Sequence, residues 1–201
     1  MTLETARRVF AALGASLDVL PKWQGADLER LMDARHAATV ERVASMVQRR
    51  GWDPLAEVSY SVGERGAIDL LATRVDALAV AVFEIKTDLP RIEETIRRHE
   101  EKTRLAPKLV KARLGWWPEV VDRFLVMPGD DRLRRIVARH GRAFHGRYPS
   151  DSRTIAAWLR DPSTSAGGIW FIAPMRGTRR NELGTRAKRI RRPTAAPREH
   201  G

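Results

Sequence analysis

Apolar and polar residues alternate along residues 57–62, where glutamate and serine are interleaved with valine and tyrosine. A period of two is typical of a strand with one buried face. Two further apolar runs follow at residues 66–73 and 80–87. We therefore expect three consecutive strands, the last two of which form an antiparallel hairpin.

Helical spacing of apolar residues predicts helices on both sides of these strands. Valines at positions 40, 43 and 47 indicate a helix that ends near Gly51, because glycine is common just after a helix C-terminus. A long helix with a densely charged face is expected over residues 90–113, with Pro90 in its first turn. The remaining expected elements are short helices at 4–13 and 26–32, a strand at 120–127, helices near 133–137 and 155–159, and a strand at 168–172.

This order defines the expected fold class, an α/β domain with a central mixed sheet flanked by helices. The 201 residues are enough for one domain with a sizeable core. We divide the chain into an N-terminal helical segment (1–37), a main domain (38–175) and a basic tail (176–201).

Three charged residues stand inside the apolar runs: Asp69, Glu84 and Lys86. Charged groups are rare in buried strands unless they are paired or bind a metal. Glu84 and Lys86 are two residues apart, so their side chains share one face of the strand. A hairpin turn centred between residues 76 and 77 places Asp69 directly opposite Glu84. These three residues therefore predict a functional site on the hairpin.

Two clustered carboxylates repel each other, and one pKa rises unless a cation lies between them. A hard divalent cation with oxygen ligands satisfies this requirement, and we expect Mg²⁺, with Mn²⁺ as a substitute. Lys86 would lie beside the ion, where it can orient or help to deprotonate a water molecule and offset charge on a phosphorus centre.

Asp69 followed by Glu84-Ile85-Lys86, with a helix on either side, resembles the PD-(D/E)XK nuclease superfamily. The resemblance covers residues 39–127, and Ile68 stands where the superfamily signature has proline. It implies a restriction-endonuclease-like αβββαβ core and Mg²⁺-dependent hydrolysis of DNA, with Asp69 and Glu84 as metal ligands and Lys86 as a catalytic residue.

Residues 57–61, 63–69 and 101–106 resemble, more narrowly, an actinobacterial group of nuclease-like domains that often carry an amino-terminal helix-turn-helix. Residues 1–37 are too few for such a reader domain, so we expect this chain to lack it. The same resemblance implies that Arg65, Lys102 and Arg104 contact nucleic acid.

The superfamily often supplies a third acidic residue, and two candidates stay open. Glu41 lies on the helix before the strands, and Glu57 lies in the segment of closest resemblance, which favours it slightly. A solvated helix carboxylate is an equally good interpretation of Glu41.

The formal net charge is +12, and residues 176–201 contain nine Arg or Lys against two Glu. A basic balance favours polyanions, since neutralised phosphates release counterions. We therefore predict DNA as the partner, although a solubilising tail explains the same charges. The tail residues assigned to nucleic-acid contact are Arg186, Lys188, Arg189, Arg191 and Arg192.

Other features narrow the function classes. Cysteine is absent, which excludes disulfides and thiolate metal sites. No apolar stretch is long enough to span a bilayer and the start shows no signal-peptide pattern, so we expect no membrane partner and a cytoplasmic location. A homodimer is left open. The alternative to a nuclease is a catalytically silent nuclease-fold module that binds DNA or regulates transcription.

Overall fold

The computed structural model describes residues 3–14, 26–61 and 65–173. Its central feature is a five-stranded sheet in the order β1-β2-β3-β4-β5. The strands are β1 (Asp53–Tyr60), β2 (Gly66–Arg74), β3 (Ala79–Ile85), β4 (Val120–Pro128) and β5 (Gly168–Ile172). β1, β2 and β3 are antiparallel, whereas β3, β4 and β5 are parallel, which confirms the expected mixed sheet.

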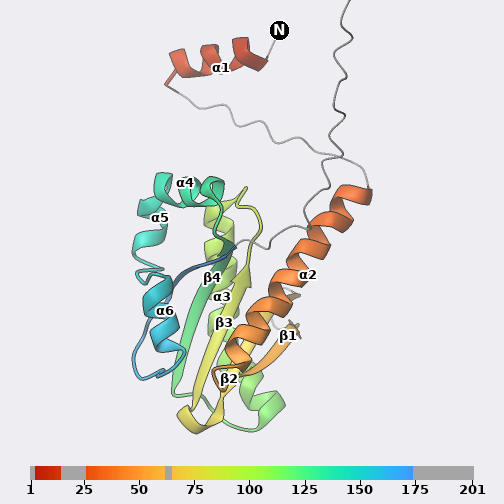
Figure 1. The fold of residues 1–201 in the computed structure, drawn as a ribbon, viewed down its shortest axis with the longest axis vertical. Helices are drawn as coiled ribbons and strands as arrows, with labels where there is room; N and C mark the ends of the chain where they lie inside the picture. Colours follow the sequence, from red (N-terminus) through yellow and green to blue (C-terminus); the bar gives the residue numbers. More distant parts are fainter. Residues whose placement is uncertain (1–2, 15–25, 62–64, 174–201) are drawn as a thin grey trace, which may run out of the picture.

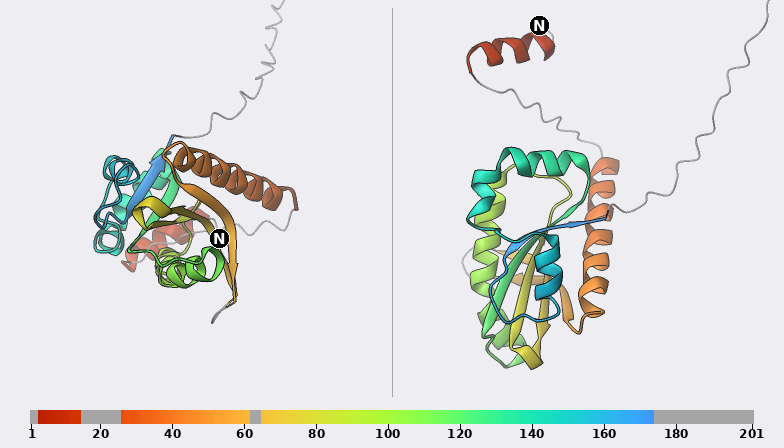
Figure 2. Two further views of the ribbon diagram at one scale, coloured as in Figure 1. Left: turned by 90° about the horizontal axis from the view of Figure 1, so that it is seen from below. Right: turned by 60° about the vertical axis from the view of Figure 1, so that its left-hand side comes forward.

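Helices cover both faces of this sheet, as Figures 1 and 2 show. The helices are α1 (Leu3–Ala12), α2 (Ala26–Gln48), α3 (Ile92–Leu114), α4 (Asp131–Arg139), α5 (Gly141–His145) and α6 (Ser152–Trp158), with a 3₁₀ helix (Val75–Ala77) between β2 and β3. α2 and α6 pack on one face, and α3, α4 and α5 pack on the other. From α2 to β4 the order is helix, three strands, helix and strand, as the sequence predicts.

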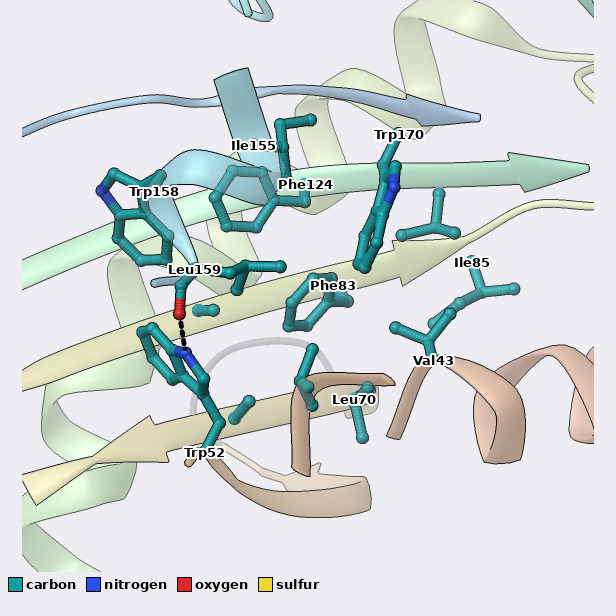
Figure 3. Close-up of a cluster of buried hydrophobic side chains, with 14 of the residues drawn as sticks. Val43, Trp52, Leu70, Phe83, Ile85, Phe124, Ile155, Trp158, Leu159 and Trp170 are labelled. Atoms are coloured by element: carbon teal, nitrogen blue, oxygen red, sulfur yellow. Dashed lines mark hydrogen bonds between the residues drawn. The ribbon is translucent and has the colours of Figure 1, made fainter. Parts of the chain in front are cut away.

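The face beneath α2 and α6 carries a large aromatic core (Figure 3). Trp52 stacks on Trp158 with ring centroids 5.2 Å apart, and its Nε1 donates a hydrogen bond of 2.8 Å to the carbonyl oxygen of Leu159. The ring centroids of Phe83 on β3 and Phe124 on β4 are 5.4 Å apart. Valines of α2 contact the same core, which fixes this helix across β2 and β3.

Three expected features of the helices differ in the structure. Residues 26–32 and the valine-rich segment after them belong to one helix, because residues 33–38 contain no glycine or proline to end it. This helix crosses the expected boundary between residues 37 and 38. Pro90 precedes the N-cap Arg91 of α3 and so lies outside its first turn. The pattern also gave no signal for α5, which has five residues.

Candidate functional site

The predicted hairpin register is confirmed and places two carboxylates on neighbouring strands. The β2–β3 ladder runs from Arg74↔Ala79 to Leu70↔Phe83, so the next facing pair is Asp69 and Glu84. Both residues lie at the end of the sheet where β2 begins and β3 ends. The site therefore combines one residue from each of two strands with side chains from α2 and α3.

Asp69 links β2 to β3 at the end of the hairpin that lies away from the turn. Its Oδ2 accepts a hydrogen bond of 2.8 Å from the backbone N–H of Ile85, just beyond the regular ladder. The side chain is 13% exposed, and its Oδ1 lies 3.3 Å from the Nζ of Lys102. His36 on α2 brings its Nε2 to 3.9 Å from Oδ2. One oxygen of Asp69 is thus held by the backbone, which fixes the direction of the other.

Glu84 is held between two lysines. Its side chain is only 3% exposed, its Oε1 lies 2.7 Å from Lys86 Nζ and its Oε2 lies 2.5 Å from Lys102 Nζ. Burial alone would raise the pKa of Glu84, but the charges of Lys102 and Lys86 outweigh burial and lower this pKa. From the sequence we expected a divalent metal ion to relieve the repulsion between the two carboxylates, whereas here two ammonium groups relieve it.

Lys102 differs most from its expected position. As part of a charged helix face it was expected to contact phosphate, yet it is buried on the inner side of α3 and bridges Asp69 and Glu84. Burial alone would lower the pKa of Lys102, but the carboxylates of Glu84 and Asp69 raise it. The residue is therefore a charged partner of the two acids.

Lys86 is the more accessible lysine of the site. Its side chain is 33% exposed, while its backbone N–H donates to the carbonyl oxygen of Val126 and continues the β3–β4 pairing. The contact with Glu84 confirms that the two side chains share a face. Lys86 can therefore reach both the buried carboxylate and the solvent.

A second polar layer, formed by His99 and Tyr148, lies beside Glu84, and no role was predicted for it. His99 of α3 is fully buried, its Nε2 lies 3.1 Å from the carbonyl oxygen of Val82, and its Nδ1 lies 2.8 Å from the hydroxyl of Tyr148. Burial lowers the pKa of His99 to about 4, so the ring is neutral at pH 7. Nε2–H then donates to Val82, and the Tyr148 hydroxyl donates to Nδ1.

Neither candidate for the third acid joins Asp69 and Glu84. Glu57 lies opposite Asp69, between the pairs Ala56↔Leu70 and Val58↔Ile68, but it has a left-handed φ of 49° and an exposed side chain. Glu41 is exposed on α2. Over residues 3–14, 26–61 and 65–173, no three His, Asp or Glu side chains gather as a metal cluster. Which of the two acids assists stays a prediction.

Of the predicted nucleic-acid contacts other than Lys102, the structure describes Arg65 and Arg104. Arg65 is exposed just before β2. Arg104 is also exposed, and it follows Lys102 by two residues, about 200° around the helix, so it points away from the carboxylates. The basic residues between 186 and 192 lie outside the described residues.

The donor set is compatible with a hard divalent cation. Such ions take oxygen ligands, and Mg²⁺ often binds through one or two carboxylates while waters and phosphate oxygens complete its coordination. Asp69 and Glu84 already share one cationic atom, Lys102 Nζ, so their oxygens converge closely enough for a common cation.

No family model, curated protein or solved structure matches this chain. The resemblance to PD-(D/E)XK nucleases consequently depends on the residues themselves. In the part of the chain that the structure describes, no helix is long and apolar enough to cross a membrane.

Proposed function

We propose that this chain is a Mg²⁺-dependent DNA phosphodiester hydrolase of the PD-(D/E)XK type. The observation that carries the proposal is the facing pair Asp69 and Glu84 at the open end of adjacent strands, with Lys86 on the same face. The order of helices and strands around the pair supports it, because this is the order that the resemblance implies.

The roles follow from the position of each side chain. Asp69 and Glu84 would hold the metal ion, which when bound would supply Lewis acidity and a more acidic water. Lys86 would orient the attacking water and stabilise negative charge on the phosphate, since its ammonium reaches solvent. The strand end that carries it is held by two hydrogen bonds, from Lys86 N–H to the carbonyl oxygen of Val126 and from Ile85 N–H to the carboxylate of Asp69. Lys102 keeps the carboxylates ionised and oriented before substrate binds.

DNA as substrate is supported by charge. The chain has a formal charge of +12, and contacts with the phosphate backbone supply most of the non-specific affinity of DNA-binding proteins.

The basic tail provides a test of this charge argument. If residues 176–201 follow the phosphate backbone of DNA, removing them should weaken binding to all DNA sequences and flatten the salt dependence of that binding. Each lost phosphate contact should change the slope of log affinity against log salt by about 0.9. Fluorescence anisotropy with duplex DNA at several salt concentrations measures this, and an unchanged slope leaves the tail as a solubilising segment.

The decisive test is cleavage by the purified protein. Supercoiled, nicked, linear and single-stranded DNA are incubated with Mg²⁺ or Mn²⁺, and the products are separated on gels. Asp69→Asn, Glu84→Gln and Lys86→Ala should each abolish turnover while circular dichroism shows a folded protein. Lys108→Ala is the matched control, because Lys108 is exposed on α3 away from the carboxylates. If no DNA form is cut by wild type with either ion, the hydrolase proposal is wrong.

A second candidate function is a catalytically silent module that binds DNA or regulates transcription. The observation that favours it is Lys102, which neutralises the carboxylates without any metal. In that case wild type binds DNA but never cuts it, and Asp69→Asn leaves the affinity for DNA unchanged. The gel and anisotropy measurements together separate the two candidates.

A further inference from the structure

The four charged side chains of the site form a balanced set. Asp69 and Glu84 contribute two negative charges, and Lys86 and Lys102 contribute two positive charges. Of the two acids, Lys86 contacts Glu84, through Oε1. Lys102 contacts both acids, so it alone bridges them within the described residues.

The two lysines also differ in exposure. The Lys102 side chain is 10% exposed and that of Lys86 is 33% exposed. Lys102 comes from the inner face of α3, between His99 and Ala106, which are both fully buried. Its ammonium is therefore placed by packing, whereas a surface lysine would sample many positions in water.

An ion that takes oxygens from both Asp69 and Glu84 competes with this ammonium. Two cations held by the same pair of oxygens repel each other strongly where water is largely excluded. The flexible four-carbon stem of lysine allows the ammonium to leave without movement of the helix. Competition for the oxygens therefore sets the affinity of the site for a metal.

We infer that Lys102 is a built-in counter-ion that occupies the cation position between Asp69 and Glu84, and that a divalent metal binds only by displacing its ammonium. The inference rests on the proposed function, because it assigns the regulation of that same metal site. It predicts that the wild-type site is weak for metal and that Lys102 tunes its affinity.

The test compares Lys102→Met with Lys86→Met by calorimetric titration with Mn²⁺ and with Mg²⁺. Methionine keeps the unbranched shape and most of the length of the lysine side chain and removes its charge. Lys102→Met should bind Mn²⁺ at least about tenfold more tightly than wild type, which is about 1.4 kcal/mol. Lys86→Met removes an equal charge but leaves the bridging ammonium in place, so its gain should be several times smaller.

Thermal unfolding supplies a second readout, independent of cleavage. Without metal, Lys102→Met should melt below wild type, because the buried Glu84 and the partly buried Asp69 lose a shared partner. A given Mn²⁺ concentration should raise its melting temperature more than that of wild type, since tighter binding to the folded state stabilises it more. Equal shifts in the two proteins would contradict the inference.

A measurement on wild type covers the case in which Lys102→Met does not fold. An amine-acylating reagent is applied with and without Mn²⁺, and modification of each lysine is followed by mass spectrometry. Displacement should make Lys102 several-fold more reactive, while the exposed Lys108 stays constant. Unchanged reactivity of Lys102 at saturating Mn²⁺ would overturn the inference.

The outcomes distinguish this inference from the proposed function. If Lys102→Met binds metal more tightly than wild type and wild type does not cleave DNA, the counter-ion inference is supported and the hydrolase proposal is wrong. If wild type cleaves DNA and the two proteins bind metal equally tightly, only the counter-ion inference is wrong. If neither protein binds Mn²⁺ or Mg²⁺, the inference and the metal-dependent function are both wrong.

Discussion

Phe83 and Glu84 are neighbours on β3 and both are almost fully buried, yet they belong to different environments. Phe83 points into the aromatic core beneath α2 and α6 (Figure 3), where its partners are other rings. Glu84 points toward α3, and its partners are Lys102 of that helix and Lys86, which directly follows β3. Apolar burial needs only matched volume, whereas a buried charge needs partners with defined positions. The aromatic face of the sheet, beneath α2 and α6, therefore depends on close packing. The charged face, by which we mean Asp69, Glu84, Lys86 and Lys102 with His99 and Tyr148 beside them, depends on the pairing of its polar groups.

The largest effect is expected on the aromatic face. Phe83→Ala removes a ring that contacts Phe124 and Trp170, so the free energy of unfolding should fall by about 3–5 kcal/mol. Urea denaturation followed by tryptophan fluorescence measures the loss. Phe83→Leu keeps most of the volume and should cost less than about 1.5 kcal/mol. Equal losses for the two variants would show that this face is not closely packed.

The charged face should respond to pH through His99. Because burial lowers its pKa from 6.5 to about 4, the unfolded chain takes up a proton in this range before the folded protein does. Stability due to neutral His99 is present above pH 6.5 and is lost as the pH falls toward 4. Glu84 opposes the shift, while Lys102 and Arg123 increase it.

At about 1.4 kcal/mol per pKa unit, acidification from pH 6.5 to 4 should remove about 3 kcal/mol through His99. His99→Gln can keep both hydrogen bonds but does not titrate. Urea denaturation of both proteins at pH 7, 5.5 and 4 isolates the effect, since other groups titrate alike in the two. If wild type and His99→Gln differ by the same free energy of unfolding at all three pH values, the lowered pKa of His99 is wrong.

The hairpin and its facing acids could be predicted from sequence because both depend on local rules. Alternation fixes which side chains share a face, and the position of the turn fixes the register, so Asp69 and Glu84 were correctly paired. The left-handed backbone of Glu57 could not be predicted, because alternation says nothing of a residue that departs from extended conformation.

The partners of the acids were missed for a different reason. The inner stripe of α3 follows a helical period through Ile92, Ile96, Ala106 and Val110, and His99 and Lys102 fill the gap in that stripe. Extending this helical period to positions 99 and 102 would have placed both side chains on the buried side of α3. Tyr148 gave no such signal, since it lies between α5 and α6 in a segment without periodicity and meets His99 only through the tertiary fold.

A smaller effect is expected when the charge of Glu84 is removed. Glu84→Gln leaves Lys86 and Lys102 beside a neutral amide, so metal-free stability at pH 7 should fall by about 1–3 kcal/mol. The folded pKa of Glu84 lies below 4.5, so its contribution is present above pH 4.5 and is lost as the pH falls through the folded value. The difference between wild type and variant should therefore shrink on acidification.

Glu101→Gln is the matched control on α3, where Glu101 pairs with the exposed Arg97. A surface pair contributes little, so this change should stay within about 0.5 kcal/mol. Chemical denaturation at pH 7 and at pH 4 measures both variants. A more stable Glu84→Gln protein would mean that repulsion between the acids outweighs their pairing with the lysines.

The smallest effect tests the outer part of the charged face, where Tyr148→Phe removes only a hydroxyl. That hydroxyl donates to His99 Nδ1, so the variant leaves a buried acceptor without a partner and should lose about 1–2 kcal/mol. Tyr60→Phe is the control, because Tyr60 is half-buried and water can replace its contacts, which predicts a change within about 0.5 kcal/mol. The lost bond should also alter the imidazole resonances of His99 in NMR spectra. If Tyr148→Phe matches its control in stability and leaves the His99 resonances unchanged, the second polar layer does not hold His99, and the charged face ends at Glu84 and its lysines.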